Sequence, residues 1–262
     1  MIRALYTSAT GMTAQETNID VISNNLANVN TTGYKRSRAE FQDLIYQYLV
    51  EPGAATSQTT KNPSGIQVGL GVKTASVKKV FTQGDLTPTG NQLDIAIEGD
   101  GFLTVQMPDG TDSYSRAGSL QLDSNGQVVS ADGYVVGPGI TIPNNATAIT
   151  IAQDGTVNAK IPGSTALSQV GTLSAVRFPN NAGLRAIGQN LYQETESSGS
   201  PTTGTFNDSG FGKVSQGFLE TSNVSVVEQV VNMITAQRAY EANSKGIQAA
   251  DEMLNQAINL KR

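Results

Sequence analysis

The sequence predicts an α+β protein that is mainly β, with an N- and C-terminal coiled-coil helix pair, an antiparallel β domain and an extended arm. Three observations predict this class. Apolar residues recur every seven positions near both ends of the chain, and they alternate along short segments in the middle. Between those segments, Gly repeatedly follows Asp or Asn, which is typical of tight turns between antiparallel strands.

The first predicted helix runs from about residue 2 to residue 29. Its main apolar row repeats every seven residues and comprises Leu5, Met12, Ile19 and Leu26. A second row contains Ile2, Ala9, Ile22 and Val29. A repeat of this length indicates a narrow coiled-coil seam rather than a broad globular face. The helix should stop before Gly33, which suits a left-handed exit.

The last predicted helix runs from about residue 225 to residue 260, and Ser225 with Glu228 forms a capping box. Its apolar row comprises Val226, Met233, Tyr240, Ile247 and Leu254. Small residues three positions later would let another helix approach closely, and these are Ala236, Ala250 and Ala257, with Asn243 as the polar exception. Gly246 is a weak point of the helix.

Pairing of the two helices with each other would leave apolar side chains uncovered, namely Val227, Val231 and Ile234. We interpret this surplus as a sign of oligomerisation. The alternative is that each helix packs on a globular core.

Alternating apolar residues and turn signals predict strands in the middle of the chain. We expect a terminal helical domain of residues 1–43 with 222–262, an arm or long hairpin over 44–80, and an antiparallel β domain over 81–221. Low apolar content and frequent Gly distinguish the arm, which is most evident from residue 46 to residue 72. Residues 195–210 are rich in Ser, Thr, Gly and Pro and are interpreted as a loop.

Composition excludes several kinds of chemistry. The 262 residues contain no His and no Cys, so Ser-His-Asp and Cys-His nucleophiles, His or Cys zinc sites and disulfides are absent. The net charge of −5 argues against nucleic acid as a partner. The densest basic run, Lys35, Arg36 and Arg38, is interpreted as a solvated turn. No apolar run is long enough for a transmembrane helix or a signal peptide, so no membrane insertion is expected.

Three groups of residues invite chemical interpretations that we consider weak. Asp94, Glu98 and Asp100 form an acidic cluster that could serve a glycosidase or a glycan binder, although turn and strand-edge carboxylates are favoured. The segment 123–126 resembles half of a calcium loop but is better explained as a hairpin turn. Gly65, Gly69 and Gly71 lack the lysine of a phosphate loop. We therefore expect no catalytic residue, no cofactor and no metal.

The last turns of the first helix are crowded with Asn24, Asn25 and Asn28. Asn is a poor helix former, so several together suggest amides that reach across an interface and fix its register. A fraying helix end rich in capping residues is the alternative. The predicted assembly interface consists of these residues and the two apolar rows: Leu5, Met12, Ile19, Asn24, Asn25, Leu26, Asn28, Val226, Met233, Tyr240, Ile247 and Leu254.

Two long segments resemble signatures of the flagellar basal-body rod and hook family. They are Ile22-Ser-Asn-Asn-Leu-Ala-Asn-Val-Asn-Thr-Thr-Gly-Tyr-Lys-Arg36 and Val231-Asn-Met-Ile-Thr-Ala-Gln-Arg-Ala-Tyr-Glu241. Segments 65–72, 81–94 and 98–102 are similar to those of its distal rod members, and the resemblance spans essentially the whole chain. Family members usually carry a larger residue in place of Ala242 and Ala in place of Gly246.

The resemblance implies a structural subunit of the bacterial flagellar distal rod, and no enzyme. Such subunits polymerise into a hollow helical drive shaft that transmits torque from motor to hook and provides the export channel. The implied partners are further copies of the chain, the proximal rod, the hook and ring proteins and a rod-capping muramidase. The implied location is the basal body across the periplasm, reached through the flagellar type III apparatus without a cleaved signal peptide.

Overall fold

The computed structural model describes residues 2–53, 63–163 and 167–259. The chain forms two compact units. The helical unit comprises Met1–Ala27, Ser37–Lys78 and Ser225–Arg262, and the β unit comprises Asn28–Arg36 and Lys79–Val224. Residues 28–36, placed with the helices by the sequence, group here with the β unit. The three-part division expected from the sequence, with a separate arm, stays a prediction.

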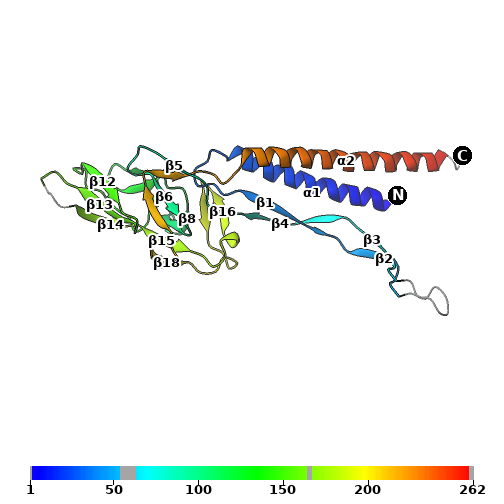
Figure 1. Ribbon diagram of the computed structural model, residues 1–262, viewed down its shortest axis with the longest axis horizontal. Helices are drawn as coiled ribbons and strands as arrows, with labels where there is room; N and C mark the ends of the chain where they lie inside the picture. Colours follow the sequence, from blue (N-terminus) through cyan, green and yellow to red (C-terminus); the bar gives the residue numbers. More distant parts are fainter. Residues whose placement is uncertain (1, 54–62, 164–166, 260–262) are drawn as a thin grey trace. The chain divides into compact units, whose positions relative to one another are not determined.

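The helical unit contains the two long helices, α1 (Ile2–Ala27) and α2 (Val226–Asn259). They lie side by side and antiparallel, so that the start of α1 and the end of α2 are at the same end of the pair (Figure 1). The Ser225 hydroxyl accepts a 3.5 Å hydrogen bond from the Glu228 N–H, which supports the predicted cap. Gly33 adopts φ 69°, so its predicted left-handed conformation is confirmed.

The same unit includes four strands of the arm. β1 (Ser37–Asp43) pairs with β4 (Val72–Lys79), and β2 (Tyr46–Val50) pairs antiparallel with β3 (Ile66–Gly69). The described strands of this segment are therefore paired, and a separate arm stays a prediction. The stretch of the predicted arm from Thr56 to Thr60 lies outside the described residues.

The β unit is built on a nine-stranded sheet with the order β16-β17-β8-β7-β11-β10-β9, in which β15 pairs with both β7 and β18. All of its described pairings are antiparallel, as predicted. Its strands are β7 (Phe102–Gln106), β8 (Asp112–Ser115), β9 (Leu120–Leu122), β10 (Val128–Ser130), β11 (Val135–Val136), β15 (Ser174–Arg177), β16 (Arg185–Gly188), β17 (Leu191–Gln193) and β18 (Thr202–Thr205).

Smaller antiparallel sheets complete the β unit (Figure 1). One has the order β12-β13-β14, and the two-stranded pairs are β19-β6 and β20-β5. Their strands are β5 (Leu86–Pro88), β6 (Ile95–Glu98), β12 (Ala148–Ile151), β13 (Thr156–Lys160), β14 (Ser168–Thr172), β19 (Lys213–Gln216) and β20 (Phe218–Glu220). A short 3₁₀ helix, η1, spans Asn181–Gly183.

The core of the β unit follows from the alternation of apolar residues along these strands. A large cluster contains Ile95, Leu103, Val105 and Phe206, all nearly inaccessible to solvent. A second cluster is aromatic and joins Phe102, Tyr114, Phe178 and Tyr192, with Phe81 packed against it. Its rings meet edge to face, for example Tyr114 and Phe178 with centroids 4.8 Å apart.

One local prediction is confirmed and another is wrong. Residues 123–126 form the turn between β9 and β10, where the Gly126 N–H donates to the Asp123 carbonyl at 2.8 Å. The supposed loop over residues 195–210 contains strand β18 (Thr202–Thr205), which pairs with β15. Its Thr side chains are exposed, so no apolar alternation marks it as a strand.

Candidate assembly interface

The seam between α1 and α2 is lined by small and polar residues. On α2 the buried positions are Gln229, Ala236 and Ala250, which share one heptad row with Asn243. A side chain at Gly11 of α1 would bring its Cβ within 2.8 Å of the Asn243 amide nitrogen, and one at Gly246 would lie 3.2 Å from the Ser8 hydroxyl. Ala236 and Ala250 are buried, as expected for close helix approach, whereas Ala257 is exposed; the glycines add two close contacts between the helices.

The side chains of the large apolar rows are only partly buried or are exposed in the single chain. The residues of partial exposure are Leu5, Met12, Ile19, Leu26, Met233, Ile247 and Leu254, and those that are exposed are Val226 and Tyr240. The buried residues of α1 are Ala14, Ile22 and Asn25. The two helices pair as expected, and the residues that are buried in the described parts of both helices lie outside the two main apolar rows.

α2 carries a second apolar face away from α1. Val227, Val231 and Ile234 are 75%, 56% and 46% exposed. At about 100° per residue they lie roughly 140–200° around the helix from Gln229, which is buried. A helix that is apolar on opposite faces is typical of an element with two packing partners. Among the described residues, the face of α2 that carries Val227, Val231 and Ile234 stays exposed.

Asn25 joins the two helices to the arm. Its side chain is buried, with 2% of its surface exposed. Its amide nitrogen donates to the Ser37 carbonyl at 2.8 Å and to the Gln229 side-chain oxygen at 3.2 Å, while its oxygen accepts from the Ser37 N–H at 2.8 Å. Asn24 is exposed, and Asn28 accepts a hydrogen bond from the Thr31 hydroxyl at 3.2 Å. The role of these three residues between chains stays a prediction.

The interpretation of Lys35 as part of a solvated turn is wrong, because its side chain is fully buried in the β unit. The Lys35 ammonium lies 2.5 Å from one oxygen of Glu220 and donates to the Thr82 carbonyl at 2.8 Å. Arg116 Nε donates to the other Glu220 oxygen at 3.0 Å. We call Lys35, Arg116 and Glu220 the buried ionic cluster. Arg38 of the same run differs, since its side chain is largely exposed.

The buried ionic cluster holds two cations and one carboxylate, and its pKa values reflect this excess of positive charge. Burial by itself would raise the pKa of Glu220, but the attraction of Arg116 and Lys35 outweighs it and brings the pKa below 4.5. Burial and repulsion from Arg116 hold the pKa of Lys35 below 10.5 despite its pairing with Glu220. Sequence reasoning missed this cluster because Glu220 is 185 and 104 positions from its partners.

The acidic cluster considered for sugar chemistry has structural partners. Asp94 accepts hydrogen bonds from the Thr89 hydroxyl at 2.6 Å and from the Asn91 amide at 3.0 Å. Glu98, at the end of β6, accepts from Ser215 and pairs with a Lys on the neighbouring strand β19. The hydrogen bond from Ser215 leads the lowering of the Glu98 pKa. The Ser215 hydrogen bond and the ion pair hold Glu98 at the strand edge, which favours the strand-edge interpretation.

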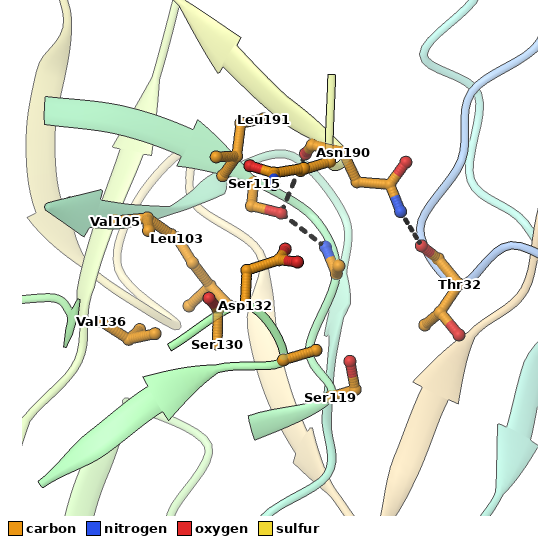
Figure 2. Close-up of a pocket in the computed structure, with 13 residues that line it drawn as sticks. Thr32, Leu103, Val105, Ser115, Ser119, Ser130, Asp132, Val136, Asn190 and Leu191 are labelled. Carbon is orange, nitrogen blue, oxygen red and sulfur yellow. Dashed lines mark hydrogen bonds between the residues drawn. The ribbon is translucent and has the colours of Figure 1, made fainter. Parts of the chain in front are cut away.

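A cleft of about 210 Å³ lies in the β unit beside β8 and β17 (Figure 2). The Ser115 hydroxyl donates to the Asn190 carbonyl at 3.0 Å and accepts from the Ala117 N–H at 3.1 Å. The Asn190 amide in turn donates to the Thr32 carbonyl at 3.0 Å. The only titratable residue among the lining residues is Asp132. These polar groups hold strand ends and residues 28–36 together.

The described residues hold neither a candidate membrane-spanning helix nor a candidate metal site. In the described parts of residues 2–259, no helix combines the length and apolar character needed to cross a membrane. Over the same residues, no group of three or more His, Cys, Asp or Glu side chains is placed to hold a metal ion.

The terminal helices carry an exposed apolar face in the described residues. The central charges of the β unit are paired internally. These two features are typical of a structural subunit that assembles with further chains. Three family profiles match the chain. "Flagella basal body rod protein" matches residues 5–35, "Flagellar hook protein FlgE/F/G D1 domain" matches residues 96–159, and "Flagellar basal body rod FlgEFG protein C-terminal" matches residues 215–260.

Curated relatives match over their whole length. Flagellar basal-body rod protein FlgG of Buchnera aphidicola subsp. Acyrthosiphon pisum is 50% identical over 260 residues, covering 99% of this chain and 100% of the relative. The protein of the same name from Borreliella burgdorferi is 50% identical over 264 residues, covering both chains completely. That of Bacillus subtilis is 39% identical over 267 residues, again covering both. The chain belongs to the flagellar basal-body rod protein family.

Proposed function

We propose that this chain is a structural subunit of the bacterial flagellar distal rod, which polymerises into a hollow helical drive shaft. The shaft transmits torque from the motor to the hook, and its lumen provides the export channel. The subunit acts by packing against its neighbours and not by catalysis.

The observation that carries this proposal is the second apolar face of α2. Val227, Val231 and Ile234 lie in water in the single chain, although each side chain would be stabilised by about 1.5–3 kcal/mol on full burial. The seam with α1 leaves this face exposed in the described chain, and another copy of the chain is the partner that we propose for its burial. In a helical polymer every subunit supplies the same face, and the apolar surface is covered along the whole shaft.

The names of the relatives support a subunit of the basal-body rod, and the arm supports its assignment to the distal part of the rod. The arm strands β2 and β3 carry exposed apolar side chains, among them Tyr48, Leu49 and Ile66. An exposed apolar hairpin is suited to contacts with neighbouring subunits, which would stiffen the shaft.

The proposal includes a location and further partners. The protein assembles in the basal body, and we propose that it spans the periplasm after export through the flagellar type III apparatus without a cleaved signal peptide. The further partners are the proximal rod, hook and ring proteins and a rod-capping muramidase. The assembly interface consists of the residues predicted from the two helices, together with the second face of α2.

The test introduces charge on the second face. Val227→Asp and Val231→Asp should each abolish rods formed by the purified chain in electron micrographs, because assembly would bury an unpaired carboxylate. Circular dichroism of the unassembled variants should match that of the parent chain, since both positions are exposed. Asn232→Asp adds the same charge at an exposed position of the same helix and serves as the control.

Two outcomes would contradict the proposal. Normal rods from both Val→Asp variants would show that this face lies outside the interface. A loss of β structure in the unassembled variants would show that the face packs within the chain. Glycan cleavage that disappears on replacement of Asp94, Glu98 and Asp100 by amides would support the alternative of a sugar-acting enzyme.

A further inference from the structure

The buried ionic cluster joins early and late parts of the chain inside the β unit. Lys35 belongs to the segment that follows α1, Arg116 follows strand β8, and Glu220 is the last residue of β20. In addition, the Gly33 N–H donates to the Glu220 carbonyl at 2.8 Å, and the Gly84 N–H donates to its carboxylate at 2.9 Å. A single residue near the end of the chain therefore holds three earlier segments.

We propose that the buried ionic cluster acts as a closing latch. The β unit can close only after the strand that carries Glu220 is in place, because only then can the cluster form. A chain that enters a compartment with its N-terminus first would then remain incompletely folded until residue 220 has emerged. This use of the latch rests on the proposed export of the chain, whereas the latch itself is a property of the isolated protein.

The charges of the cluster explain why closure has to wait. Without Glu220, seating of residues 28–36 would bury Lys35 and Arg116 together with no anion. Arg116 would keep only neutral acceptors, the carbonyl oxygens of Ile97, Gly99 and Gly101 at 2.9–3.2 Å. Burial of unpaired charge is strongly unfavourable, and loss of one partner of a buried ion pair destabilises a protein far more than loss of an exposed one. The early segment is therefore stable in its site only after β20 has paired with β5.

Asn223 provides a second closure close to the first. Its side-chain oxygen accepts from the Arg36 N–H at 2.7 Å, and its amide donates to the Val80 and Thr82 carbonyls at 2.8 and 3.0 Å. These bonds again join the segment after α1 to the chain just before α2. The two residues that close the early segment thus lie within four positions of each other, late in the sequence.

Late closure by Glu220 should affect the unfolding rate of the β unit much more than its folding rate. Contacts that form late in folding have little influence on the folding rate and a large influence on the unfolding rate. In the full-length protein, Glu220→Gln should raise the unfolding rate of the β unit about a hundredfold and change its refolding rate by less than about threefold. Stopped-flow tyrosine fluorescence can follow this unit, because Tyr114 and Tyr192 are buried in its aromatic cluster and the chain has no Trp.

Tryptic cleavage gives an independent measurement of the open state. The peptide bond after Lys35 should be protected in the parent protein, and Glu220→Gln should accelerate its cleavage at least tenfold. Glu98→Gln is the matched control, since Glu98 also ends a strand and pairs with a Lys but is partly exposed. The control should leave the unfolding rate and the cleavage at Lys35 within about twofold of the parent values.

The result that would overturn the inference is a refolding rate that falls by as much as the unfolding rate rises, because Glu220 would then act in the folding nucleus. Unchanged cleavage at Lys35 would overturn it too. If Glu220→Gln does not fold, Glu220→Asp keeps the charge, and the same partition between the two rates decides the question. The measurements use unassembled protein, so failure of rod formation would refute the proposed function without affecting them.

Discussion

Asn25 is the residue through which we would test the connection between the helices and the arm. Replacement by Ala removes three hydrogen bonds, two to the backbone of Ser37 and one to Gln229. Because Asn25 is 2% exposed, water does not readily replace these bonds. The Ser37 N–H loses its acceptor, and the start of β1 should become free to separate from the helix pair.

The size of the effect follows from the number of bonds. Each of the three hydrogen bonds contributes about 1 kcal/mol net, and Ala regains about 0.6 kcal/mol as the better helix former. The expected loss is therefore about 2–3 kcal/mol for the local structure. At about 1.4 kcal/mol for each factor of ten, the opening equilibrium at Ser37 should increase roughly 30- to 150-fold.

Amide hydrogen exchange at Ser37 measures this opening directly. In Asn25→Ala the Ser37 amide should exchange faster by that factor, while amides of the β unit core should be unaffected. Asn232→Ala replaces an exposed Asn of the same helix pair and should leave Ser37 unchanged. If Ser37 exchanges at the parent rate in Asn25→Ala, the bonds of Asn25 do not hold β1, and the reasoning is refuted.

Three further predictions concern the β unit. Gly33→Ala should lower the stability of the β unit in urea by at least about 1–2 kcal/mol, because φ of Gly33 is 69° and a Cβ would lie 2.8 Å from the backbone nitrogen of Ala117. Gly90 lies in open space, so Gly90→Ala should change the stability little. Equal urea midpoints for the two variants would contradict this prediction. Phe206→Ala, at a side chain 1% exposed, should cost about 3–5 kcal/mol in the same assay, and a loss below about 1 kcal/mol would be inconsistent with its core position. The pKa of Glu220 is lowered in the folded state, so its contribution to stability is fully present above about pH 4.5 and is lost as the pH falls through the folded-state pKa. Urea midpoints should therefore fall more steeply with decreasing pH in the parent protein than in Glu220→Gln. Parallel curves for the two proteins would exclude a contribution of the ionised Glu220 to stability.

The resemblance stated from the sequence is confirmed, and the sequence also determined the existence of both terminal helices. The heptad rows and the Ser225 cap give α2 nearly its observed limits, Val226 and Asn259. Gly33 adopts the left-handed conformation expected of it, although α1 already ends at Ala27. These features are local, since a helix and its caps are specified by residues a few positions apart.

The tertiary structure decided which helix faces meet and which charges are buried. The centre of the α1–α2 seam is taken by Gly11 and Ala236 because small residues let the backbones approach, although the large apolar residues dominate the pattern of the sequence. Likewise, the sequence indicated a solvated Lys35, because a charged side chain is rarely buried without a partner. That partner is Glu220, brought beside it only by the fold of the β unit. Local patterns determine helices and turns, whereas pairing between distant residues depends on the path of the chain.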